Sequence, residues 1–124
     1  MKLAFILPAL LFAGPALAQT QAEMTAQAGA AFNRADAAMT REWQATYAAM
    51  KRLDAAGPTR AVAYGYAAST LDSQRAWLKF RDAQCRIEGA EFAGGSLQPM
   101  TTAGCRTRLT NERAAQLRKL RWTR

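Results

Sequence analysis

Few residues in this sequence could carry out catalysis. The chain has two cysteines, Cys85 and Cys105, and no histidine, so a serine or cysteine nucleophile would lack its usual base. The two cysteines do not form a C-x-x-C pair, and no set of four metal ligands accompanies them. Glu88 and Glu91 could share one helix face, but nothing marks them as a buried pair beside a sugar site. The sequence therefore predicts a protein that is not an enzyme and that holds no metal or cofactor.

The first 18 residues have the three parts of a secretory signal peptide, namely a basic start, an apolar run and a small-residue cleavage site. The stretch from Leu3 to Ala18 has only 16 residues and contains Pro8 and Pro15, whereas a membrane-spanning helix needs about 20 apolar residues. We therefore expect cleavage after Ala18. This leaves residues 19–124 as one domain in the periplasm or outside the cell.

Export determines how the two cysteines are interpreted. Paired thiols are oxidised outside the cytoplasm, so we expect a disulfide between Cys85 and Cys105. A closed loop of about 20 residues should stabilise the domain by about 3 kcal/mol through the entropy of loop closure. That contribution is large for a domain of this size.

The chain is basic, with 17 lysines and arginines against 9 acidic residues and a net charge of +8. The basic residues are spread along all the predicted helices, and no groove-reading motif occurs among them, which argues against nucleic acid as a partner. A positive exported surface favours anionic envelope components, such as the phosphates of lipopolysaccharide. The high arginine content could equally reflect compositional bias.

Hydrophobic periodicity predicts an all-α fold. Apolar side chains recur every three or four positions from residue 24 to residue 53, so we expect a long amphipathic helix from residue 23 that Gly57 and Pro58 terminate. Gly29 could mark a bend or break in it, and residues 19–22 should fray. The remaining chain is expected to form helices over 67–90 and 101–120 and a loop over 92–99. Residues 61–66 could form helix, which we favour, or an irregular connection. These elements predict a small antiparallel bundle of about three helices.

The helix expected over residues 67–90 carries one stripe with a recognisable pattern. Helical spacing places on one face the side chains of Gln74, Trp77, Leu78, Arg81 and Cys85. If the disulfide aligns this helix antiparallel to the last one, the stripe meets that helix in a defined register. In this register Trp77 faces Arg113, Gln74 lies near Leu117, and Arg81 lies near Leu109 and Glu112.

This register predicts a packing motif made of Gln74, Trp77, Arg81, Glu112 and Arg113. Trp77 should belong to the core, because large aromatic side chains dominate small cores, and Arg113 should stack on it as a cation–π contact. An inward arginine usually needs a carboxylate, so we expect Arg81 to pair with Glu112. The alternative is that Arg81 and Asp82 form a partner-binding pair.

The residues around the two cysteines also resemble a known family. The resemblance rests on segment 74–85, the loop Gly94-Gly95-Ser96, Cys105, Leu109, Thr110, Arg113 and Leu117. These residues occur in an order and spacing similar to those of the lysozyme-inhibitor LprI-like family, whose members are small secreted bacterial proteins. The resemblance covers roughly the last two-thirds of residues 19–124.

This resemblance implies a binding protein that blocks lysozyme without catalysis and so protects the cell wall. The partner would be lysozyme or another envelope protein. Animal lysozymes are cationic, so the acidic side chains of Asp82, Glu88 and Glu91 near the disulfide are the candidate partner-binding residues. The alternative is an envelope structural or interaction module that binds anionic surface components and has no enzyme target.

Overall fold

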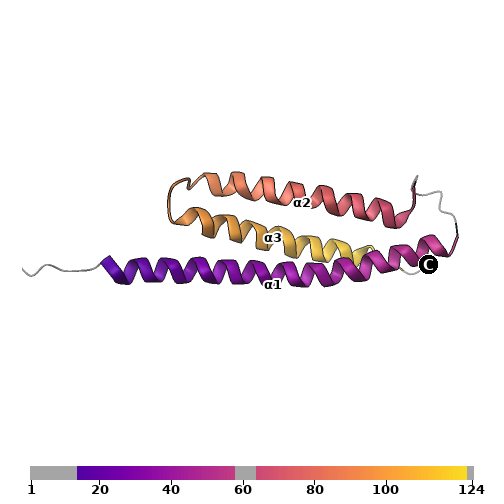
Figure 1. The fold of residues 1–124 in the computed structure, drawn as a ribbon, viewed down its shortest axis with the longest axis horizontal. Helices are drawn as coiled ribbons and strands as arrows, with labels where there is room; N and C mark the ends of the chain where they lie inside the picture. Colours follow the sequence, from indigo (N-terminus) through magenta and orange to yellow (C-terminus); the bar gives the residue numbers. More distant parts are fainter. Residues whose placement is uncertain (1–13, 58–63, 123–124) are drawn as a thin grey trace, which may run out of the picture.

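The described part of the protein folds into three helices that lie side by side (Figure 1). The structure, a computed structural model, describes residues 14–57 and 64–122. These form α1 (Gly14–Ala55), α2 (Tyr66–Ala90) and α3 (Leu97–Lys119), and no strand occurs within those two ranges. Helices α2 and α3 form an antiparallel hairpin, and α1 packs mainly along α3. The predicted all-α bundle is therefore confirmed.

The long first helix is continuous. It passes through Gly29 without a break and ends just before Gly57, which has a φ of +147°. The residues expected to fray, 19–22, are helical instead. Gln21 helps to hold this end, because its Nε2 donates a hydrogen bond to the carbonyl oxygen of Ser96 at 3.2 Å. The predicted signal peptide lies partly outside the described residues, at 1–13, and residues 14–18 belong to α1.

The expected boundaries of the other two helices need two corrections. Helix α2 begins at Tyr66, close to its predicted start. Of the helix expected over 61–66, residues 61–63 lie outside the described residues, and the expectation is wrong at Tyr64 and Gly65, because Tyr64 lies in a turn and Gly65 has a φ of +100°. Helix α3 begins at Leu97 instead of residue 101. Pro99 falls in its first turn, where the backbone N–H groups have no partner within the helix, so a proline is tolerated there.

The end of α1 supplies the cap for the start of α2. Gly65 precedes α2 with a φ of +100° and has no side chain to serve as a cap. The carboxylate of Asp54 takes over this role, because it accepts hydrogen bonds from the backbone N–H groups of Tyr66 at 2.8 Å and Ala67 at 2.9 Å. An acidic group at a helix start also interacts favourably with the helix dipole. The contact fixes the start of α2, and with it the α2–α3 hairpin, beside the end of α1.

The core contains two small clusters that Trp77 joins. One cluster contains the buried side chains of Met39, Ala114 and Leu117. The other contains Cys85, Cys105 and Leu109, and the partly buried Trp77 packs against both. The predicted disulfide is present, with Cys85 and Cys105 bonded at 2.02 Å and their Cα atoms 5.4 Å apart. The disulfide therefore joins α2 to α3 within the core.

A close approach between α2 and α3 beside the disulfide requires glycine at position 89. A Cβ atom added to Gly89 would collide with Oγ1 of Thr102. That hydroxyl cannot turn away freely, because it donates a hydrogen bond to the carbonyl oxygen of Gln98 at 2.9 Å. Helices that pack this closely use small residues at the point of contact.

We expect Gly89→Ala to lower the free energy of unfolding by about 1–3 kcal/mol, because it overpacks this contact. Gly104→Ala is the matched control, since a Cβ at this helical glycine meets no atom within 4 Å. It should raise stability by about 0.5–1 kcal/mol through helix propensity. Urea denaturation followed by circular dichroism measures both changes. Equal effects of the two substitutions would contradict the proposed close contact.

Candidate functional site

Arg81 is the centre of a buried polar cluster between the three helices. Its guanidinium lies between two aromatic rings, 5.3 Å from the ring centroid of Phe32 and 5.2 Å from that of Trp77. The Nη1 atom lies 3.1 Å from Oδ1 of Asp36, and Nε lies 3.0 Å from Oδ1 of Asp82. Nη1 also donates a hydrogen bond to the hydroxyl of Thr110 at 3.4 Å. Arg81 thus connects α1, α2 and α3.

The expected pairing of Arg81 with Glu112 is wrong. The carboxylate that reaches Arg81 across the bundle is Asp36 of α1. Glu112 is exposed on the outside of α3 and lies 3.7 Å from Arg108, one turn earlier on the same helix. The physical reason is that the inner face of α2 meets α1 as well as α3, so Arg81 finds its carboxylate on α1.

Arg113 forms the second half of the cluster. Its Nε donates a hydrogen bond to Oε1 of Gln74 at 2.9 Å, and its Nη2 donates one to the hydroxyl of Ser73 at 2.9 Å. The guanidinium carbon lies 5.8 Å from the ring centroid of Trp77. Burial lowers the pKa of Arg113 below its ordinary value, but arginine stays charged at neutral pH. Gln74 donates in turn to the sulfur of Met39 at 3.2 Å, so this network fixes side chains of all three helices.

Of the three candidate partner-binding residues, two hold arginines of the same chain. Asp82 lies within ion-pair distance of Arg81, and Glu88 accepts hydrogen bonds from Nη2 of Arg108 at 3.0 and 3.2 Å. Glu91 follows the end of α2 and is exposed. A partner that binds Asp82 or Glu88 would therefore have to compete with an internal arginine.

Two carboxylates are ionised more readily than usual. The hydrogen bond from Arg121, together with Arg118, lowers the pKa of Glu42 below its ordinary value of 4.5, although partial desolvation opposes this. The hydrogen bond from Gln84 and the neighbouring Arg108 lower the pKa of Glu88 in the same way. Each carboxylate therefore favours the folded state while it is charged.

These shifts predict a loss of stability in acid. Above pH 4.5, Glu42 and Glu88 are charged in both states, and their contribution is fully present. As the pH falls towards their folded pKa values, the unfolded state binds protons first and stability is lost. The double variant Glu42→Gln with Glu88→Gln should show a flatter decline in urea midpoint between about pH 6 and pH 3. The control Glu23→Gln should keep the wild-type decline, and an unchanged double variant would refute the assignment.

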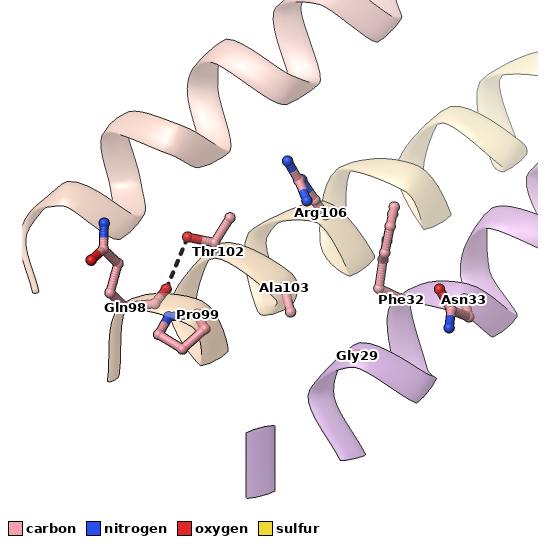
Figure 2. A pocket seen from close by; sticks show the side chains of 8 residues that line it. All are labelled: Gly29, Phe32, Asn33, Gln98, Pro99, Thr102, Ala103 and Arg106. Atoms are coloured by element: carbon pink, nitrogen blue, oxygen red, sulfur yellow. Dashed lines mark hydrogen bonds between the residues drawn. The ribbon is translucent and has the colours of Figure 1, made fainter. Parts of the chain in front are cut away.

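A cleft of about 460 Å³ opens between α1 and the start of α3 (Figure 2). Phe32, Pro99 and Ala103 give it an apolar wall, and Arg106 lies at its edge. The guanidinium of Arg106 is 5.8 Å from the ring centroid of Phe32, and its Nε is 3.8 Å from Oδ1 of Asp82. Such a cleft can receive an apolar or anionic group of a partner, but its lining includes no general base.

Nothing in the described part of the chain assembles a metal site, since no group of three or more histidine, cysteine or acidic side chains occurs there. Both cysteines are bonded to each other. The search for membrane spans in this same part finds no helix long and apolar enough to cross a bilayer. The sequence had not indicated Phe32, Asp36 or Arg106, because they contribute to the site only after α1 packs against the hairpin.

The fold, the disulfide and the arginine cluster define a class of small, disulfide-bonded helical proteins. The sequence model of a family described as Lysozyme inhibitor LprI matches residues 14–117, so the chain belongs to the LprI family. An uncharacterized protein of Rhizobium meliloti (strain 1021) is 36% identical over 104 residues, which cover 83% of this chain and 75% of the relative. No solved structure matches the chain. The matched segment includes all of α1 and α2 and all but the last two residues of α3.

Proposed function

We propose that this protein is an exported inhibitor that binds lysozyme and blocks it without catalysis. The observation that carries the proposal is the family match over residues 14–117. The site geometry supports a binding role, because the polar side chains of the cluster hold one another in place and leave no nucleophile beside a base. The rigid three-helix body would present a preformed surface, which lowers the entropic cost of binding.

Export through a cleaved signal peptide is part of this proposal. In the uncleaved chain, α1 extends past the turn between α2 and α3 (Figure 1). Gln21 is the residue that contacts this turn, through Ser96, so cleavage after Ala18 would leave a helix that starts close to the end of the bundle. The intact mass of periplasmic protein should correspond to a chain that begins at Gln19. A mass that includes residues 1–18 would contradict this part of the proposal.

Charge limits how a cationic lysozyme could bind. The chain carries a net charge of +8, so long-range repulsion should slow the association at low salt. The local contact would use the acidic end of α2, where Glu91 is exposed and Asp82 and Glu88 could exchange their internal arginines for those of the partner. Glu91→Lys should therefore weaken inhibition, whereas Asp72→Lys, which changes an exposed carboxylate near the opposite end of α2, should not.

The test is to titrate the purified protein against lysozyme that digests cell walls, at several salt concentrations. A repelled but specific complex gives inhibition that saturates with added protein and strengthens as salt rises, because salt screens the repulsion. Inhibition by Asp72→Lys should match the wild type, which would show that added charge alone is not the cause. No inhibition at any ratio would remove this function and leave the interaction-module alternative.

A further inference from the structure

The outer face of α2 carries an apolar stripe that no other part of the described chain covers. Phe80 is 53% exposed and Ile87 is 67% exposed. Between and beside them lie the exposed Ala76, Ala83 and Ala90. The five residues are separated by alternating steps of four and three, which is the spacing of a coiled-coil seam. We call these five residues the α2 seam.

One edge of the α2 seam is basic. Arg75, Lys79 and Arg86 lie along this edge and are exposed, and none of them forms an ion pair within residues 20–57 and 64–122. Arg81, Arg108 and Arg118, by contrast, all hold carboxylates. The basic edge therefore retains charge that a partner can neutralise.

From this arrangement we propose that the α2 seam docks an amphipathic helix of another protein, whose apolar stripe is flanked by carboxylates. The alternation of alanine with Phe80 and Ile87 leaves room for a second helix backbone to approach closely. The carboxylates would lie opposite Lys79 and Arg86, at the positions that set partner choice in paired helices. This surface adjoins the acidic end of α2, because Ala90 directly precedes Glu91, but its test does not measure inhibition of lysozyme.

Two other occupants fit the surface less well. A second copy of this chain would bring a second basic edge and a second net charge of +8 to the interface, which is repulsive. A lipid surface binds a helix through a broad face of large apolar side chains, whereas three of the five seam residues are alanines. The small side chains suit helix packing better than insertion into lipid.

The test uses two synthetic helical peptides that share one leucine and alanine seam and differ only in flanking residues, which are glutamate in one and lysine in the other. The disulfide-bonded protein should bind the glutamate peptide about tenfold or more tightly than the lysine peptide, measured by fluorescence anisotropy. The double variant Phe80→Ser with Ile87→Ser should lose binding of both peptides. Lys79→Glu with Arg86→Glu should reverse the preference.

The matched control is Arg34→Glu with Arg41→Glu, because these exposed arginines have the same spacing on α1 as Lys79 and Arg86 have on α2. It should keep the preference for the glutamate peptide. Equal loss in both charge variants would show a response to net charge alone and overturn the proposal. The protein could instead self-associate in sedimentation or float with anionic vesicles. If Phe80→Ser with Ile87→Ser abolishes either behaviour, the proposal is overturned in favour of that occupant.

Discussion

Replacing Cys85 and Cys105 together with alanine is expected to lower the free energy of unfolding by about 3 kcal/mol. The disulfide closes a loop with a sequence separation of 20 residues, so its loss returns conformational freedom to the unfolded chain. Cys85 is fully buried and Cys105 is 4% exposed, and the smaller alanines should add a further packing loss. For a chain with a core this small, such a change is a large fraction of the total stability.

Urea denaturation with and without reductant separates the two contributions. Reduced wild-type protein loses the cross-link but keeps both sulfur atoms. Its free energy of unfolding should therefore lie between those of the oxidised wild type and the alanine variant. The variant itself should not respond to reductant. Equal stability of oxidised and reduced wild type would show that the helices pack as firmly without the bond.

Arg81→Ala should be similarly damaging, with a loss of about 3 kcal/mol in the free energy of unfolding. The substitution removes a charge-assisted hydrogen bond to Asp36, of the kind that contributes about 1.5–3 kcal/mol. It also removes the contacts with the Phe32 and Trp77 rings, for which about 0.5–2 kcal/mol each is typical. These contributions are not additive, because all of them depend on one guanidinium.

Two further variants test the reason for this loss. Arg81→Lys keeps the charge but not the planar fork that reaches Asp36 and Asp82 together, so it should recover only part of the stability. Arg75→Ala removes an exposed arginine from the same helix and should change stability by less than about 0.5 kcal/mol. Full recovery with lysine would mean that the charge alone stabilises the cluster.

The α2–α3 hairpin could be predicted from the sequence because its information is local. The five-residue stripe from Gln74 to Cys85 and the disulfide fix the facing sides of both helices, and the antiparallel register then brings Arg113 to Trp77. The predicted start of α3, at residue 101, was wrong for an equally local reason. A loop composition of glycine, serine and proline hides the fact that Pro99 is acceptable in a first helical turn.

The contacts made by α1 could not be predicted in this way. Asp36 lies 45 residues before Arg81, and spacing within the hairpin carries no information about which part of α1 packs beside it. The same limit applies to Asp54, whose carboxylate caps α2 across a connection of 12 residues. Polar contacts between distant elements depend on the final packing, whereas apolar periodicity reports only that a face will be buried.

The measurement that tests the central claim most directly is residual lysozyme activity as a function of molar ratio and of incubation time. An inhibitor that binds without catalysis should reduce activity in proportion to the amount of protein added, down to complete inhibition at a fixed ratio. The inhibition should then stay constant during longer incubation and disappear when lysozyme is recovered from the complex. Activity that keeps falling at a small fraction of that ratio would show catalysis, and activity unaffected by any excess of protein would contradict the proposed function.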